Sequence, residues 1–284
     1  MRCNLCPNMC GADRTRAAGR CGAKETVRIA KFYLHSFEEP VIAGEKGSGT
    51  VFFCGCPLKC VFCQNYEVSR NLRGKYISDK ELAEIFKKLE NEGATNINLV
   101  NPTHYSRAIM RALDIYRPNI PVVYNTHGYE RIDILNEINP YIDIYLPDMK
   151  FYSPALSERY TGISDYFEKA SAAIEFMAEK PLVFGDKGIM KSGTLVRHLV
   201  LPQCTSDSKK ILDWFADIKD KAFINVMSQY TPFGDIEKFP ELKRKITKRE
   251  YESVLEYAMS LGIENMFYQK TESADTIYIP KWDY

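Results

Sequence analysis

Three cysteines with the spacing C-x3-C-x2-C are the residues of this chain best suited to chemistry. They are Cys56, Cys60 and Cys63, in a run that also holds Gly55 and Pro57. A [4Fe–4S] cluster that is fully ligated by protein takes four thiolates. Three thiolates leave one iron open, and that iron can bind a small molecule and pass it an electron. The spacing therefore predicts a catalytic cluster rather than a simple electron-transfer centre.

Two other interpretations of this triad compete with the open cluster. Free cysteine is among the most buried residue types, but three structural cysteines in one short turn fit that poorly. Zinc is the second alternative, and it usually takes four protein ligands, of which Cys54 would be the fourth. Cys54 follows an apolar, strand-like run, residues 50–53, so its side chain either faces the site or packs in the core. We favour the open cluster and leave Cys54 unassigned.

A second group of cysteines occupies the first 21 residues with the spacing C-x2-C-x3-C-x10-C. Its members are Cys3, Cys6, Cys10 and Cys21. The surrounding segment is poor in apolar residues and too short to build a core of its own, so a bound metal would supply the missing stability. We predict a second metal site here. Four thiolates suit either zinc or a closed [4Fe–4S] cluster, and the spacing does not decide between them.

Composition limits the protein class and its partners. The chain has 284 residues, 45% of them hydrophobic, which is enough for one large α/β domain. The net charge of +1 gives no broad field for nucleic acid or for an acidic partner. No apolar run approaches the roughly 20 residues of a membrane helix, and no signal peptide begins the chain. Nine cysteines without an export signal indicate metal ligation in the cytoplasm, and an exposed cluster implies oxygen sensitivity and an anaerobic setting.

Short strand-like runs alternate with helical patterns after residue 49. The strand-like runs, apolar on both faces and rich in Val and Ile, are Thr50–Cys54, Asn96–Asn101, Pro121–Thr126, Ile142–Pro147, Thr194–Leu201 and Phe223–Ser228. Helices are predicted at Ser106–Tyr116, Glu130–Glu137, Asp165–Glu179 and Ser208–Lys219, and after the capping boxes Ser78/Glu81 and Thr247/Glu250. This alternation predicts a parallel sheet with crossover helices.

Polar side chains gather where these predicted strands end. The cysteine loop follows the first strand, Asn101 and Thr103 follow the second, and Asn125 and Thr126 end the third. Asp148 and Lys150 follow the fourth, Arg197 lies in the fifth and Gln229 ends the sixth. Barrel enzymes place their chemistry on the loops after the strands. We therefore expect these residues to meet at one end of a barrel.

The cysteine run, with the aromatic Phe62 before its last cysteine, resembles the signature of the radical S-adenosylmethionine (SAM) superfamily. The resemblance implies a fold, a partial (β/α)6 TIM-like barrel of the α/β class. The expected organisation is a Cys-rich metal-binding segment at residues 1–24, a connecting segment at 25–49 and the barrel at 50–284. It also implies that the open iron chelates SAM and that one-electron reduction yields a 5′-deoxyadenosyl radical. A flavodoxin- or ferredoxin-type electron donor is the implied partner.

The strand ends resemble one branch of that superfamily, the uncharacterised homologues of pyruvate formate-lyase activating enzyme. The motifs that carry this resemblance are Gly47–Phe53, Cys63–Tyr66, Asn96–Val100, Pro102–His104, Tyr124–Thr126, Tyr145–Asp148, Val196–Pro202 and Met227–Tyr230. Together they span nearly the whole chain.

The resemblance implies a SAM-binding role for particular positions. Asn101 and Thr103 stand where activating enzymes have a Gly-Gly-Glu segment that binds the SAM amino group, so the usual carboxylate is missing. The implied cation and SAM-carboxylate site comprises Asn125, Thr126, Asp148 and Lys150, and Arg197 matches another SAM-contacting position.

Several functions remain open at this point. The favoured one is a radical SAM enzyme, either an activase of a glycyl-radical enzyme or an enzyme acting on a small molecule or peptide. The alternative class is a non-enzymatic iron–sulfur protein for electron transfer or sensing. Histidines near strand ends (His104, His127 and His198) and tyrosines expected to line the site (Tyr105, Tyr124, Tyr145 and Tyr230) are further candidates.

Overall fold

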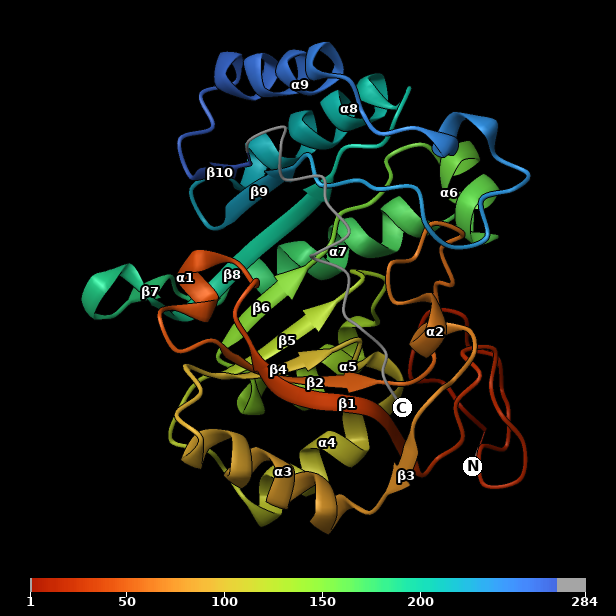
Figure 1. Ribbon diagram of the computed structural model, residues 1–284, viewed down its shortest axis with the longest axis vertical. Coiled ribbons are helices and arrows are strands. Elements are labelled where there is room, and N and C mark those ends of the chain that lie inside the picture. The colour runs from red at the N-terminus through yellow and green to blue at the C-terminus, as the bar shows by residue number, and fades with distance from the viewer. Residues whose placement is uncertain (1, 270–284) are drawn as a thin grey trace.

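One curved sheet organises the chain, and the computed structural model describes it over residues 2–269 (Figure 1). The strand order is β10-β9-β8-β6-β5-β4-β2-β1-β3, with β7 paired to β8. The strands from β2 to β10 along this path run parallel, and β1 pairs antiparallel with both β2 and β3. The predicted α/β class and partial barrel are therefore confirmed.

The strands are mostly short, apart from β1 and β8. They are β1 (Val27–His35), β2 (Ser48–Phe53), β3 (Lys75–Ile77), β4 (Ile97–Val100), β5 (Val122–Thr126), β6 (Ile144–Pro147), β7 (Val183–Phe184), β8 (Met190–Leu199), β9 (Phe223–Met227) and β10 (Met266–Tyr268). Each of the six predicted strands is present.

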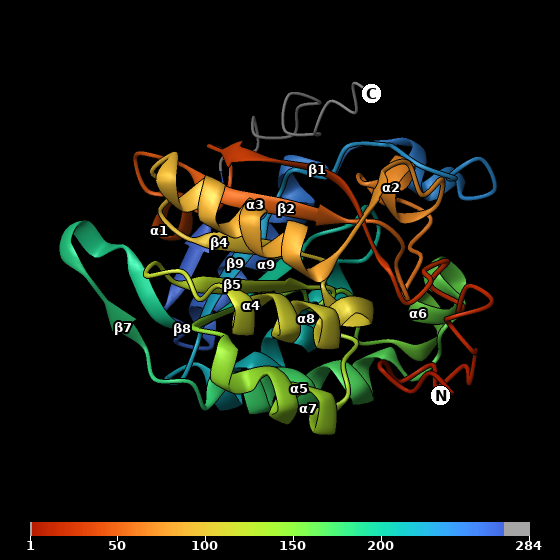
Figure 2. The same ribbon diagram turned by 90° about the horizontal axis from the view of Figure 1, so that it is seen from below.

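The helices lie mostly on the outer face of the sheet (Figures 1 and 2), except that α1 packs inside the barrel. They are α1 (Pro40–Ala43), α2 (Tyr66–Ser69), α3 (Asp79–Asn91), α4 (Ser106–Ile115), α5 (Ile132–Ile138), α6 (Pro154–Thr161), α7 (Tyr166–Ala178), α8 (Thr205–Phe215) and α9 (Lys248–Ser260). Both predicted capping boxes form, at the start of α3 and of α9. Among the residues described, no helix is long and apolar enough to cross a membrane.

The stretch predicted only to connect, residues 25–49, instead belongs to the sheet. It contains β1 and α1, and β1 pairs with β2 from Ile29 to His35. The sequence pattern missed β1 because this outer strand is mostly half-buried and lacks the continuous apolar run of the central strands.

Side chains alternate between the two faces of each central strand, and this alternation fills the barrel. On β5, Val122 and Tyr124 pack outward in the cluster that includes α3 and α4, whereas Val123 and Asn125 face inward. The neighbouring strands contribute apolar Ile144, Leu146 and Leu195 and, further along, polar Asp148 and Arg197. The barrel is therefore apolar toward the amino ends of its strands and polar toward their carboxyl ends.

The segment from β1 into α1 closes the amino end of the barrel. Ile42 is fully buried against the inward apolar side chains of β5, β6 and β8. The side-chain amide of Asn96 donates to the carbonyl of Ile42 (2.7 Å), and the hydroxyl of Thr95 donates to that of Ala43 (2.7 Å). These bonds fix α1 at the start of β4, and they set the position of the two glutamates that precede it.

Candidate functional site

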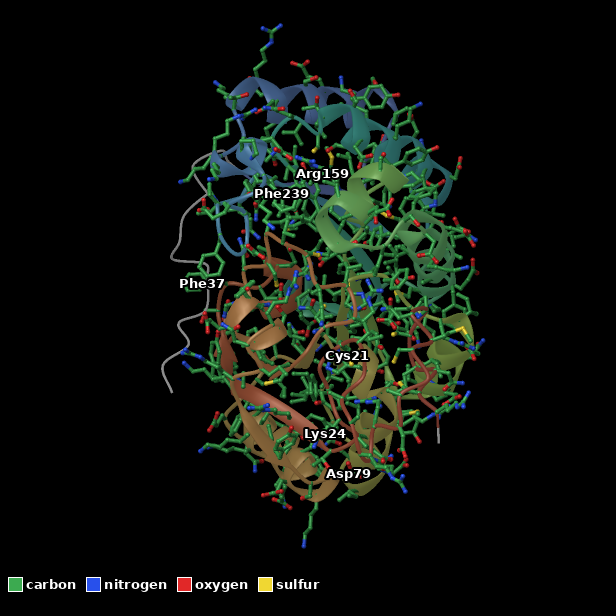
Figure 3. All side chains as sticks on the ribbon, turned by 90° about the vertical axis from the view of Figure 1, so that its right-hand side faces the viewer. Cys21, Lys24, Phe37, Asp79, Arg159 and Phe239 are labelled. Carbon is green, nitrogen blue, oxygen red and sulfur yellow. The ribbon has the colours of Figure 1, made fainter. Side chains whose placement is uncertain are left out.

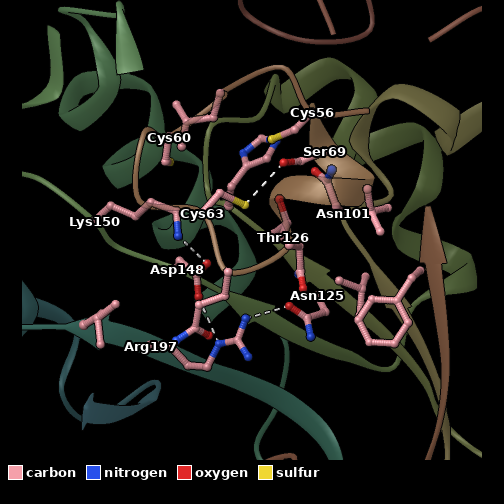
Figure 4. Close-up of a pocket in the computed structure, with 18 of the residues that line it drawn as sticks. Cys56, Cys60, Cys63, Ser69, Asn101, Asn125, Thr126, Asp148, Lys150 and Arg197 are labelled. Carbon is pink, nitrogen blue, oxygen red and sulfur yellow. Dashed lines mark hydrogen bonds and ion pairs between the residues drawn. The ribbon is translucent and has the colours of Figure 1, made fainter. Parts of the chain in front are cut away.

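A cavity of about 250 Å³ opens at the carboxyl ends of the strands. Cys56, Cys60 and Cys63 line one end of it, together with Phe62 (Figure 4). All three cysteines are free thiols, and Cys56 and Cys60 are buried. Burial raises the pKa of the Cys56 thiol to about 11 and also raises the pKa of Cys60. The structure thus brings the predicted triad to one wall of one cavity.

Two glycines allow the close packing that shapes the cysteine loop. Gly55 has a φ of +91°, and a Cβ there would lie 2.7 Å from the carbonyl oxygen of Cys21. At Gly234 a Cβ would lie 2.4 Å from the carbonyl oxygen of Val61. The backbone amide of Cys56 donates to the Cys21 carbonyl at 3.0 Å. The loop is therefore held between the N-terminal segment and the chain after β9.

Cys54 and Ser69 have different relations to the triad. The thiol of Cys54 donates to the carbonyl of Arg73 (3.1 Å) and does not line the cavity, so it is not placed as a fourth ligand. The hydroxyl of Ser69, at the end of α2, donates instead to the sulfur of Cys63 (3.3 Å; Figure 4). Ser69 is itself buried and lines the cavity. Sequence reasoning missed this contact because it depends on the turn of α2.

Asn101 and Thr103 separate, although they are close in sequence. Asn101 follows β4 in a left-handed conformation (φ +61°), donates to the Gly55 carbonyl and lines the cavity. Its side-chain oxygen is buried and has no hydrogen-bond partner. Thr103 does not line the cavity, contrary to its predicted contact with SAM: it is fully buried, and its hydroxyl donates to Glu130 (2.5 Å). A short helical turn that begins at Thr103 directs this side chain into the protein.

A chain of charged groups forms the second wall of the cavity. Asp148 accepts from Lys150 Nζ (2.7 Å) and from Arg197 Nε (2.9 Å). A second Arg197 nitrogen donates to the side-chain oxygen of Asn125 (2.7 Å; Figure 4). Although burial opposes ionisation, Arg197 and Lys150 hold the pKa of Asp148 below its usual range, and Asp148 raises the pKa of Arg197. Both partners are therefore charged, and the predicted residues form one network.

Glu38 completes this network, and the sequence analysis did not identify it. Its carboxylate accepts from Arg197 (3.1 Å) and from the side-chain amides of Asn98 (2.8 Å) and Asn125 (3.1 Å). It lines the cavity from the closed, amino-terminal side of the barrel. The adjacent Glu39 is buried, which raises its pKa to about 7. Only the inward-facing asparagines of β4 and β5 could have suggested a buried carboxylate here.

A buried polar cluster lies beneath Thr126, the other predicted residue that lines the cavity. The hydroxyls of Thr126 and Thr103 both donate to the same carboxylate oxygen of Glu130. Burial raises the pKa of Glu130 to about 7. The other oxygen of Glu130 and the hydroxyl of Tyr124 are buried without a hydrogen-bond partner. Glu130 therefore fixes the side chain of Thr126, which lines the cavity, from the side that faces the protein interior.

Most of the histidine and tyrosine candidates are buried in the protein and do not line the cavity. His127 lines the cavity, and burial lowers its pKa to about 3. His198 is buried between the Met149 carbonyl and the Ser208 hydroxyl, both at hydrogen-bond distance, and His104 contacts the Cys54 carbonyl. None of the four expected tyrosines, Tyr105, Tyr124, Tyr145 and Tyr230, lines this cavity, because each is packed in the core.

Comparison with known proteins gives the family. The family model of the radical SAM superfamily matches residues 50–183. An uncharacterised protein of Methanocaldococcus jannaschii is 32% identical over 278 residues, which cover 93% of this chain and 76% of that protein. The chain belongs to the radical SAM superfamily. The family that the cysteine run resembles is confirmed.

One solved protein with a TM-score above 0.5, SuiB, shares the fold of this chain. Streptococcus suis SuiB bound to S-adenosylmethionine superposes with a TM-score of 0.53 at 14% identity, over 76% of this chain and 48% of SuiB. This chain therefore spans about half the length of SuiB. A domain of pyruvate-formate lyase-activating enzyme from Bacteroides vulgatus gives a TM-score of 0.40 at 12% identity, over 68% of this chain and 91% of that domain.

The residues of this radical SAM chain fit the cofactors that the family implies. Three free thiols on one cavity wall are the donors that an iron–sulfur cluster requires. The unpartnered oxygen of Asn101 is an acceptor for a ligand's donor group, since buried polar atoms are normally hydrogen-bonded. Charged groups of both signs line the same space, which suits the ammonium and carboxylate of an amino acid.

The N-terminal cysteines lie in one segment beside the cysteine loop. A Cβ at Gly19 would lie 3.3 Å from the sulfur of Cys10 and 3.6 Å from that of Cys21, so these two thiols are neighbours. Backbone bonds join Cys3 to Ala12 and Gly11. Within residues 2–269, no three His, Cys, Asp or Glu side chains are grouped tightly enough to hold a metal ion. The second metal site therefore stays a prediction.

Proposed function

We propose that this protein binds a [4Fe–4S] cluster through Cys56, Cys60 and Cys63 and cleaves SAM reductively to abstract hydrogen from a substrate. The observation that carries the proposal is the arrangement of the three free thiols opposite the charged wall in one cavity. A cluster held by these three thiolates would supply the one electron that reductive cleavage of SAM requires.

The protein's own part is to bind and orient SAM. The side-chain oxygen of Asn101 would accept a hydrogen bond from the SAM ammonium in place of the carboxylate that activating enzymes have. Lys150 has ammonium hydrogens beyond the one it donates to Asp148, so it is the group for the SAM carboxylate. The paired Arg197 and Asp148 then hold Asn125 in a fixed orientation beside the cofactor. Phe62 packs edge-on against Phe151, which keeps the cysteine loop rigid.

The decisive experiment is anaerobic reconstitution with iron and sulfide, followed by dithionite and SAM. We expect 5′-deoxyadenosine and methionine in equal amounts, and no product from the Cys56→Ser variant. An intact cluster by spectroscopy without any 5′-deoxyadenosine would refute the proposal. In that case the alternative of an electron-transfer or sensor protein would hold instead.

For the substrate, we propose a glycyl-radical enzyme, which the strand-end motifs favour by resemblance to activating enzymes. SuiB, which shares the fold, has been solved with its precursor peptide SuiA, so a peptide is the competing substrate class. Incubation with a candidate glycyl-radical enzyme should produce a glycyl-radical EPR signal. If genuine partners give no signal while SAM is cleaved, a small molecule or peptide is the substrate.

We also propose that Cys3, Cys6, Cys10 and Cys21 hold a second metal centre. Its support is the grouping of Cys10 and Cys21 around Gly19 in a segment with little apolar core. Elemental analysis of a Cys3→Ser/Cys6→Ser double variant tests it. Loss of zinc or loss of iron would identify the metal, and unchanged content of both would refute the site.

A further inference from the structure

The N-terminal segment carries a concentration of positive charge that the balanced whole-chain charge conceals. Its first 28 residues contain six Lys or Arg and two acidic residues, a net charge of +4. Since the whole chain carries +1, the remaining residues together carry −3. Such a local asymmetry in an otherwise near-neutral protein attracts an acidic partner to one place.

Four of these basic side chains extend into solvent, although Arg20 also donates to the carbonyl of Gly162 (3.0 Å). Arg2, Arg16, Arg20 and Lys24 are exposed, and we call them the basic patch. Arg14, by contrast, is buried and donates to backbone carbonyls, so it holds the segment together. Within the patch, Arg16 faces Asp13 across 3.6 Å with 88% of its side chain exposed, so that pair neutralises little.

A cavity beside the patch has room to bind acidic side chains of a partner. This second cavity, of about 220 Å³, lies between the N-terminal segment and the start of α4. Four arginines line it, Arg2, Arg14, Arg107 and Arg111, against one glutamate, Glu25. Arg107 and Arg111 also form ion pairs with acidic residues, yet each keeps about 40% or more of its side chain in solvent. Arginine suits carboxylate recognition because its planar head donates two parallel hydrogen bonds.

The segment that bears the basic patch is in direct contact with the cysteine loop. Cys21, next to Arg20, accepts a hydrogen bond from the backbone of Cys56 at 3.0 Å. The side-chain amide of Asn8 donates to the carbonyl of Pro57, also at 3.0 Å. Cys21 and Lys24 lie on the same side of the molecule, the side that bears the N-terminal segment (Figure 3). A protein docked on this segment would therefore lie against the backbone that holds the triad.

We infer that the N-terminal segment is the docking surface for an acidic one-electron carrier protein. This inference rests on the proposed function, because SAM cleavage consumes one electron in each turnover. The carrier is oxidised by one electron and the cluster held by the triad is reduced by one, so no further reactant is needed. The position of the patch favours a carrier over nucleic acid, since the segment that bears it contacts the cysteine loop.

The test reverses charge within the basic patch of the reconstituted protein. The variant Arg2→Glu/Arg20→Glu/Lys24→Glu is compared with wild type in binding a purified acidic flavodoxin and in the rate at which reduced flavodoxin bleaches the cluster absorbance. We expect both affinity and rate to fall about tenfold or more at low salt, since electrostatic steering changes association by about 10–1,000-fold. Wild-type binding should weaken steeply with added salt.

Two controls keep the outcome clear. Dithionite, a small reductant, should drive SAM cleavage equally in variant and wild type, so its failure in both would count against the proposed function rather than the docking surface. A matched reversal elsewhere, Lys87→Glu/Lys191→Glu/Arg249→Glu, should leave flavodoxin binding unchanged. If the patch variant loses its cluster, the test uses the single variant Lys24→Glu instead. Its flavodoxin binding is compared with that of the wild type, whose salt dependence is measured as well.

Three results would overturn the inference. The first is salt-independent binding of flavodoxin to the wild type. The second is equal binding by the patch variant and the matched reversal. The third is patch-dependent binding of a single-stranded oligonucleotide in place of flavodoxin, which would assign the patch to nucleic acid.

Discussion

Replacing Glu130 by Gln should stabilise the protein at pH 8 and leave it almost unchanged at pH 5. Burial raises the pKa of Glu130 from 4.5 to about 7. Because the folded-state pKa is the higher one, folding favours the protonated carboxyl. The stability tied to this proton is complete below pH 4.5 and is lost as the pH rises through 7.

The size of the effect follows from that shift. One pKa unit corresponds to about 1.4 kcal/mol, so a shift from 4.5 to about 7 costs about 3 kcal/mol once the carboxyl is ionised in both states. Glutamine carries no charge and keeps an oxygen to accept from Thr103 and Thr126. Its amide can donate to the hydroxyl of Tyr124, which now lacks a partner. At pH 5 the two proteins should differ by no more than about 1 kcal/mol.

Thermal and urea unfolding of wild type and Glu130→Gln at pH 5 and pH 8 measures this difference. At pH 8 the gain should raise the unfolding temperature by roughly 5–10 °C. The exposed Glu256→Gln is the matched control, because it removes a carboxylate without a buried cluster around it. A Glu130→Gln protein that is destabilised by the same amount at both pH values would refute the reasoning, since it would mean that the carboxylate is needed in its ionised form.

Three further changes test other parts of the structure. Arg197→Met leaves the Glu38 carboxylate without a cation and Asp148 with Lys150 alone, and should lower the free energy of unfolding by about 3 kcal/mol in urea; a loss below 1 kcal/mol would contradict the network. Ser69→Ala removes the hydroxyl that donates to the Cys63 sulfur and should make the cluster's midpoint potential more negative in an EPR-monitored titration, whereas Ser69→Thr should keep it near wild type. Thr247→Ala removes the cap of α9 and should cost about 1 kcal/mol of stability with no change in SAM cleavage, so altered cleavage would show an unforeseen link to the site.

The central sheet could be predicted from sequence because its signals are local. Buried parallel strands form short apolar runs, and each such run here is followed by polar residues at the carboxyl end. The capping box at Ser78 needs only Glu81, three residues away, so it too was predictable. The outer strands gave no comparable signal: β3 and β10 are three residues long, and β1 is half-buried along most of its length.

The rest of the site depends on contacts between residues that are far apart in sequence. Glu38 stands in an unremarkable stretch before α1, and its partner Arg197 is 159 residues away. Only the pairing of β1 with β2, followed by the burial of α1 in the barrel, brings the two together. Thr103 was expected at the cavity but is not there. Asn101 faces the cavity, whereas the helical turn that begins at Thr103 directs the Thr103 side chain away from it.

The position of Glu38 has a consequence for how the cavity holds charge. Arg197 would meet SAM from the polar side of the barrel, but two carboxylates, those of Glu38 and Asp148, already neutralise it. Two side-chain amides bind the remaining oxygen of Glu38, so this carboxylate is nearly saturated with donors. Arg197 therefore serves mainly to fix Asp148 and Asn125 in place, and Lys150 is left as the cation with hydrogens available to a ligand. This distinction predicts that Lys150→Met weakens SAM binding with little loss of stability, in contrast to the loss of stability expected for Arg197→Met. Equal losses of stability in the two variants, measured in urea, would show that both cations are structural.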